Sequence, residues 1–120
     1  MTKVMNVAGV KVGDLFYDSW GWEQTNIDFY QVVGLRGKTQ VVLKAIKSKK
    51  VPDGFMSCKV SPMVGAFKTG SYKTRQINGA DDSIIRRVHK DPGGRVYAGS
   101  GEYMLFGCDE HKVLSETSYA

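Results

Sequence analysis

The chain has 120 residues, the length of one ordinary domain, and 42% of them are hydrophobic, a share typical of a folded protein. Its net charge at pH 7 is +5, and no apolar run approaches the roughly 20 residues that a membrane-spanning helix needs. These values argue against a disordered chain and against a transmembrane helix. They predict a single domain over residues 1–120 and no membrane partner.

The N-terminal sequence MTKVMN alternates apolar with polar residues and lacks the apolar segment of a secretion signal, so we expect a cytoplasmic protein. In a reducing cytoplasm, Cys58 and Cys108 are expected to be free thiols in or near the core. The spacing Cys108-x-x-His111 supplies only half of a zinc site, and His89 lies far from any cysteine pair. We therefore predict neither a metal nor a cofactor.

Glycine-containing turn signals recur along the chain, and the β-branched and aromatic runs between them predict strands. The first strands are expected at 15–20, 27–35 and 39–47, and the turn Arg36-Gly37-Lys38 joins the last two into a hairpin. Alternation along the second strand predicts one face that carries Ile27, Phe29, Gln31, Val33 and Leu35.

Residues 47–54 are predicted to form a basic loop that is closed by the turn Pro52-Asp53-Gly54. Pro62 is expected to break the next strand or to confine it to a sheet edge, and residues 63–67 fit either a strand or one helical turn. Weaker strand signals lie at 55–60, 71–77, 83–89, 95–98, 102–106 and 112–115. The predicted fold class is all-β, with minor helical content allowed, as a small bent antiparallel sheet or an SH3-like or OB-like barrel.

Trp20 and Trp22 lie two positions apart, so on a strand both indoles would point to the same side. Two interpretations stay open, because the pair could close the end of the core or form an exposed binding face. A structural polar cluster is predicted beside them: Gln24, Thr25, Asn26 and Asp28. A small hydrolase could instead use Glu23 and Asp28 as acid and base, but no nucleophile accompanies them.

A longer motif surrounds these residues: GDLF at 13–16, followed by SWGWEQTNIDFYQV at 19–32. It resembles the core S-W-G-Y-[DE]-Q-T-N-[IV]-D-[FY]-Y-Q-V of a family of small, largely uncharacterised proteins of phages and other bacterial mobile elements. The similarity covers residues 10–47, about a third of the chain, and is weak beyond them apart from the closing Ser118-Tyr119-Ala120. Trp22 stands where the family has tyrosine and keeps an aromatic side chain there. The resemblance implies a phage or plasmid origin and a bacterial host cytoplasm, and it implies no activity.

Charge is concentrated in the middle of the chain. Residues 36–75 hold ten lysines and arginines against the single acid Asp53, whereas residues 1–35 and 76–120 each carry a net charge of −2. A basic segment of this kind is a candidate footprint for a polyanion, although lysines that only solvate strand faces give the same composition.

The first functional hypothesis is a non-enzymatic nucleic-acid-binding module, whose cations bind phosphates and whose exposed aromatic rings, Phe29 among the candidates, stack on bases. The cations between residues 36 and 50 are expected to cluster on the hairpin and the loop after it. The predicted binding residues are Trp20, Trp22, Tyr30, Arg36, Lys38, Lys44, Lys47, Lys49, Lys50, Lys73 and Arg75.

Three alternatives remain. A protein-binding inhibitor of a host defence complex, as small anti-CRISPR proteins are, would dock a basic face on an acidic surface of a host protein. A virion or assembly part would form a homo-oligomer through exposed strand edges. The small hydrolase that uses Glu23 and Asp28 is the third.

Overall fold

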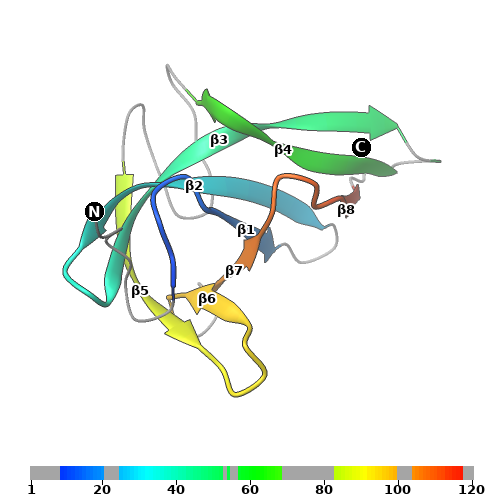
Figure 1. Cartoon of the computed structure of the whole chain (residues 1–120). Helices are drawn as coiled ribbons and strands as arrows, with labels where there is room; N and C mark the ends of the chain where they lie inside the picture. The colour runs from blue at the N-terminus through cyan, green and yellow to red at the C-terminus, as the bar shows by residue number, and fades with distance from the viewer. Residues whose placement is uncertain are drawn as a thin grey trace.

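The computed structural model describes residues 9–20, 25–52, 54, 57–68, 83–99 and 104–117. Its elements are all β-strands, which confirms the predicted fold class (Figure 1). They are β1 (Leu15–Trp20), β2 (Asn26–Arg36), β3 (Gln40–Pro52), β4 (Ser57–Phe67), β5 (Ser83–Lys90), β6 (Val96–Ala98), β7 (Leu105–Cys108) and β8 (Leu114–Thr117). A membrane-spanning helix is not found in these parts of the chain.

Six of the strands close into an antiparallel barrel. Around the barrel, β2 pairs with β1, β1 with β7, β7 with β6, β6 with β5, β5 with β3, and β3 again with β2. Closure leaves these strands without an unpaired edge, which is how small β-proteins avoid pairing with one another. The prediction of a small barrel of the SH3-like or OB-like kind is therefore confirmed.

The second half of β3 leaves the barrel and pairs with β4, and β4 pairs with β8, so that the three form a ribbon beside the barrel (Figure 1). Residues 47–52 are therefore strand, and the predicted basic loop over 47–54 is wrong. The backbone partners that β4 supplies override the low β-propensity of lysine in this run. Gly54 has a φ of +84°, a left-handed conformation that suits its predicted place in the turn Pro52-Asp53-Gly54.

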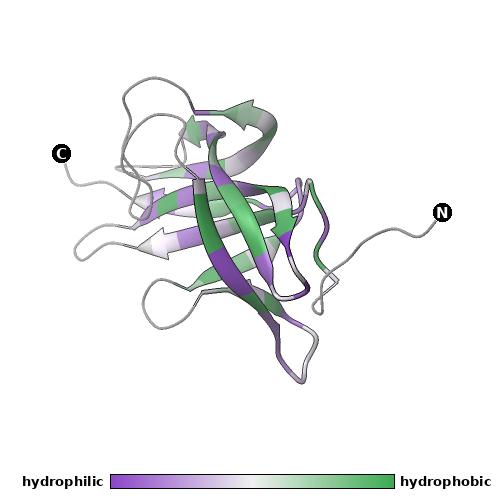
Figure 2. Ribbon diagram, turned by 90° about the vertical axis from the view of Figure 1, so that its left-hand side faces the viewer, coloured by the Kyte–Doolittle hydropathy of each residue, from purple (hydrophilic) through white to green (hydrophobic). Residues whose placement is uncertain are grey.

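The strands enclose two apolar cores, because neighbouring residues on a strand point to opposite sides. The barrel interior holds the first core: Val10, Phe16, Tyr30, Val32, Val41, Leu43, Ala45, Val88, Ala98 and Leu105. The second core lies between the ribbon and the outer side of β1 and β2: Leu15, Ile27, Phe29, Ile46 and Val60. Both sides of β1 and β2 are thus buried, and apolar and polar positions lie side by side along the strands in Figure 2.

The β2–β3 hairpin confirms the predicted turn, with Arg36 paired to Gln40 and Gly37 at φ +61°. Its register shifts at a β-bulge between Val32 and Gly34. An extra residue reverses the alternation that follows it, so Leu35 packs against the barrel core. The prediction that Leu35 shares a face with Ile27 is therefore wrong.

The strand β4 contains a larger irregularity. Ser48 pairs with Pro62 and Ile46 pairs with Phe67, so residues 63–66 stand opposite Lys47 alone. Gly65 takes φ of +78° there, and its N–H donates a 2.7 Å hydrogen bond to Gln31 Oε1. Pro62 lies beyond the last position that pairs with β8, which agrees with its predicted edge position. The segment 63–67 is strand rather than a helical turn, and the predicted strand at 71–77 lies outside the described residues.

Candidate nucleic-acid interface

The outer surface of the ribbon carries lysines and serines in rows that the strand register fixes. Lys49 of β3 pairs with Ser61 of β4, and Lys59 of β4 pairs with Ser115 of β8. Directly opposed residues point to the same side of a sheet, and residues two apart on one strand do so as well. Lys47 therefore joins them, and we call these five residues the ribbon face.

The ribbon face is cationic. The three strands contain one acid, Glu116, and its partner Cys58 packs against the second core, so the carboxylate lies on the opposite side from the ribbon face. Lys47 and Lys49 are exposed, and neither has an ion-pair partner among the residues that the structure describes. Lys59 Nζ donates a 2.8 Å hydrogen bond to Ser115 Oγ across the strand pair. This surface offers ammonium and hydroxyl donors to an anion.

Lys50 lies on the other side of the same strand and has a structural contact. Its Nζ lies 2.9 Å from Glu116 Oε1, and the Glu116 side chain is only 13% exposed. The hydrogen bond to Glu116 raises the pKa of Lys50 above its ordinary value. Lys50, predicted as a binding residue, is therefore engaged in fastening β3 to β8.

The remaining cations of the hairpin do not join the ribbon face. Lys44 lies between Leu43 and Ala45, which point into the barrel, so its side chain is on the barrel's outer side. Arg36 and Lys38 are exposed at the tip of the β2–β3 hairpin. The prediction of one cationic cluster over residues 36–50 is wrong, because β3 continues as a strand and its alternation sends neighbouring lysines to different sides.

Two of the predicted aromatic contacts are buried. Tyr30 is 0% exposed in the first core and Phe29 is 1% exposed in the second, so neither ring is available to a base. Trp20 ends β1 opposite Asn26. The direction of the Trp20 indole, together with Trp22, Lys73 and Arg75, lies outside what the structure describes.

Of the predicted polar cluster, Thr25, Asn26 and Asp28 are described and half-buried, whereas Gln24 and Glu23 are not among the described residues. Asp28 stands directly opposite Asp18 on β1. Asp18 is 1% exposed, and it is the only buried charged side chain in the described parts of the chain. Asp18 was not predicted as a buried residue, although its position two residues after Phe16 on a predicted strand was a signal for an inward direction.

Three residues of the ribbon face were not predicted as site residues: Lys59, Ser61 and Ser115. Alternation in the run SCKVS at 57–61 places Lys59 and Ser61 on one side of a strand. Their neighbours Lys49 and Ser115 come from distant parts of the sequence, so only the register of the ribbon brings the five residues together.

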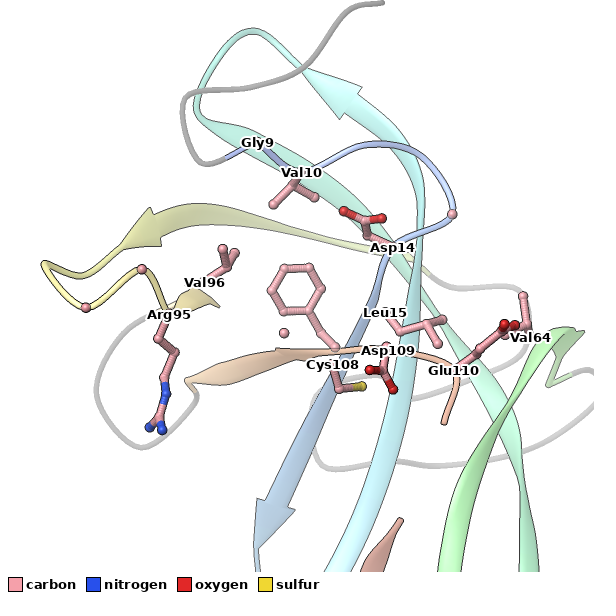
Figure 3. A pocket seen from close by; sticks show the side chains of 15 residues that line it. Gly9, Val10, Asp14, Leu15, Val64, Arg95, Val96, Cys108, Asp109 and Glu110 are labelled. Carbon is pink, nitrogen blue, oxygen red and sulfur yellow. The ribbon is translucent and has the colours of Figure 1, made fainter. Parts of the chain in front are cut away.

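A cavity of about 720 Å³ lies elsewhere, where β1 begins and β7 ends (Figure 3). Its wall combines the buried Phe16 and Val10 with the exposed Val64, so apolar and polar surface are both accessible. Of its acids, Asp14 already pairs with Lys11 Nζ at 2.8 Å, and Asp109 Oδ1 accepts the His111 N–H at 2.9 Å. The lining holds three acids, Asp14, Asp109 and Glu110, against one cation, Arg95, which disfavours an anion and distinguishes this cavity from the ribbon face.

Cys58 and Cys108 are free thiols that pack against the second core, as predicted. No cluster of three or more potential metal ligands occurs in the described portion of the chain. In comparisons with known proteins, no family model, curated protein or solved structure matches this chain.

Proposed function

We propose that the protein binds nucleic acid through the ribbon face, without enzymatic activity. The observation that carries the proposal is a strand surface with three lysines, Lys47, Lys49 and Lys59, while the one acid of the three strands is turned away from it. Lysines neutralise the phosphates of a nucleic acid and release the counterions condensed on it.

The pairs Lys49–Ser61 and Lys59–Ser115 suit the phosphate group. Each pair places an ammonium beside a hydroxyl on adjacent strands, so both can donate to phosphate oxygens. Such contacts fix the position of the nucleic-acid backbone on the protein, and they do not distinguish one base sequence from another. We therefore expect binding that depends strongly on salt and little on sequence.

The test measures the fluorescence anisotropy of a labelled single-stranded oligonucleotide over a range of salt concentrations. Lys47→Gln/Lys49→Gln should weaken binding and reduce the slope of log affinity against log salt by about 1.4, since about 0.7 counterions are released per single-strand phosphate contact. Arg95→Glu is the matched control, because it changes the net charge by the same two units on the β5–β6 turn. A wild-type slope in the double variant would reject the proposal.

Lys50 is left unchanged in this design. A Lys50→Glu substitution would place a second carboxylate against Glu116 and disturb the attachment of β8. A loss of binding in that variant would report on the fold as well as on the ribbon face.

A second candidate function is binding to an acidic surface of a host protein, as an inhibitor made by a mobile element would require. Val51 favours it, since this side chain is 49% exposed beside Lys49 and opposite Lys59. An exposed aliphatic side chain among cations is more useful to a protein partner than to a phosphate backbone. In nuclease-treated host lysate, Val51→Ser should reduce capture of one stoichiometric partner and leave oligonucleotide affinity unchanged. Equal capture by wild type and Val51→Ser would remove this candidate.

A further inference from the structure

A second cationic surface lies on the outer side of the barrel. Gln40 of β3 pairs with Arg36 of β2 on one side and with Arg87 of β5 on the other. Directly opposed residues share a side, so the two guanidinium groups flank one amide across three adjacent strands. We call these three residues the arginine face.

The arginine face is accessible. All three side chains are exposed. Neither Arg36 nor Arg87 has an ion-pair partner in the described parts of the chain. Two strand spacings separate their backbones by about 10 Å. Arginine donates two parallel hydrogen bonds to a phosphate, so this arrangement favours a phosphodiester chain over a single small anion.

Aromatic rings lie beside the arginine face. His89 is two residues after Arg87 on β5 and therefore points to the same side. Its ring stacks on Tyr97 of β6, with centroids 5.3 Å apart and an angle of 28° between the planes. Both rings are half-buried, which leaves part of each available to a base or a sugar next to the arginines.

The arginine face and the ribbon face are separated along β3. Gln40 and Lys49 are nine residues apart, which corresponds to about 30 Å of extended strand. Their side chains also point to opposite sides of β3. Gln40 points to the outer side of the barrel, whereas Lys49 lies an even number of residues after the inward-facing Val41 and Leu43 and so points to their side of the strand. The two faces therefore do not form one continuous binding surface.

We propose that the arginine face is a second nucleic-acid site, so that one molecule bridges two separate strands. The proposal rests on the proposed function of the ribbon face. With one strand on each face, the protein holds two segments near each other and raises their local concentration.

The experiment uses two non-complementary single-stranded oligonucleotides, one with a fluorescent donor and one with an acceptor, mixed with the full chain. Energy transfer should rise with protein concentration and then fall, because excess protein places each strand on a separate molecule. Arg36→Gln/Arg87→Gln and Lys47→Gln/Lys49→Gln should each strongly reduce the transfer, while each variant still binds one labelled strand by anisotropy. Arg95→Glu should retain the wild-type transfer.

Three results would overturn the inference. Wild-type transfer in Arg36→Gln/Arg87→Gln would mean that bridging arises from two copies joined through one face. Binding to the ribbon face without any energy transfer would mean that the arginine face does not hold a second strand. Absence of binding to either oligonucleotide by the wild-type chain would reject the proposed function itself.

Discussion

The Glu116 carboxylate connects three strands through one side chain. It accepts a 2.8 Å hydrogen bond from the Ile27 N–H of β2 and lies 2.9 Å from Lys50 Nζ of β3. The Cys58 thiol of β4 also donates to it, at 4.0 Å. A half-buried carboxylate with these partners adds to the four residues of backbone pairing that hold β8 in place.

Glu116→Ala should lower the free energy of unfolding by about 1–3 kcal/mol, because it leaves a part-buried backbone donor without its acceptor. Glu116→Gln keeps an acceptor oxygen for the Ile27 N–H and should cost less. Urea denaturation followed by circular dichroism measures both values. Equal stability of wild type and Glu116→Ala would show that solvent replaces these contacts at no cost.

The Cys108 thiol makes the stability of the folded protein depend on pH. Burial, together with the nearby Asp109 carboxylate, raises the pKa of its thiol from 9.0 to about 12. Because this pKa is higher in the folded state, the unfolded chain releases the proton first as the pH rises. The contribution of the protonated Cys108 thiol to stability is therefore complete below pH 9 and is lost as the pH rises from 9 to 12.

Unfolding measurements from pH 8 to pH 11 should therefore show a steeper loss of stability in wild type than in Cys108→Ala. The difference between the two curves isolates this thiol from the other groups that titrate in the same range, Lys50 among them. At pH 7.5 the folded protein should also alkylate slowly at Cys108. Parallel curves of stability against pH for wild type and Cys108→Ala would contradict a raised pKa of the Cys108 thiol.

At the scale of an element, Gly65 explains how β4 accommodates its extra residues. Its φ of +78° lies in the left-handed region, and a Cβ built on it meets no atom within 4 Å. The cost of Gly65→Ala is therefore conformational, about 1–2 kcal/mol of unfolding free energy. Gly34→Ala is the matched control, since its Cβ would lie at ordinary contact distance, 3.7 Å, from Val42. Equal destabilisation by the two substitutions in urea titrations would exclude this explanation.

The strands of the first half of the chain were predictable because their signals are local. The predicted strand at 15–20 has the observed bounds of β1, and Gly37 closes the β2–β3 hairpin as expected. The run at 47–52 was missed because four of its six residues are Lys or Ser, and its strand state depends on β4, which lies later in the chain.

The candidate site was predictable only in part, for a related reason. The sequence shows that Lys47 and Lys49 are cations. The direction of their side chains depends on whether the chain continues as a strand there, which the local sequence does not show. Ser115 and Arg87 become neighbours of β4 and β3 through pairings between distant segments. Tyr30 was assigned to binding because an aromatic residue near a basic segment looks the same whether it points inward or outward.

At the scale of the molecule, the two cores are joined by shared strands. The strands β1, β2 and β3 contribute to both, through neighbours such as Leu15 and Phe16, or Phe29 and Tyr30. Loss of the ribbon would expose the outer side of β1 and β2, and loss of the barrel would remove the surface on which the ribbon packs. This sharing predicts one cooperative unfolding transition rather than two.

Val60→Ala tests this cooperativity, because Val60 is 0% exposed in the second core and does not contribute to the first. The substitution should cost about 1.5–3 kcal/mol, from lost apolar burial and the cavity that remains. Circular dichroism follows all strands, whereas alkylation of Cys108 follows the second core, against which its side chain packs. If the cores unfold together, both probes give the same midpoint in wild type and the same lower midpoint in the variant. Alkylation of Cys108 at denaturant concentrations where the dichroism is still native would show that the ribbon opens independently of the barrel.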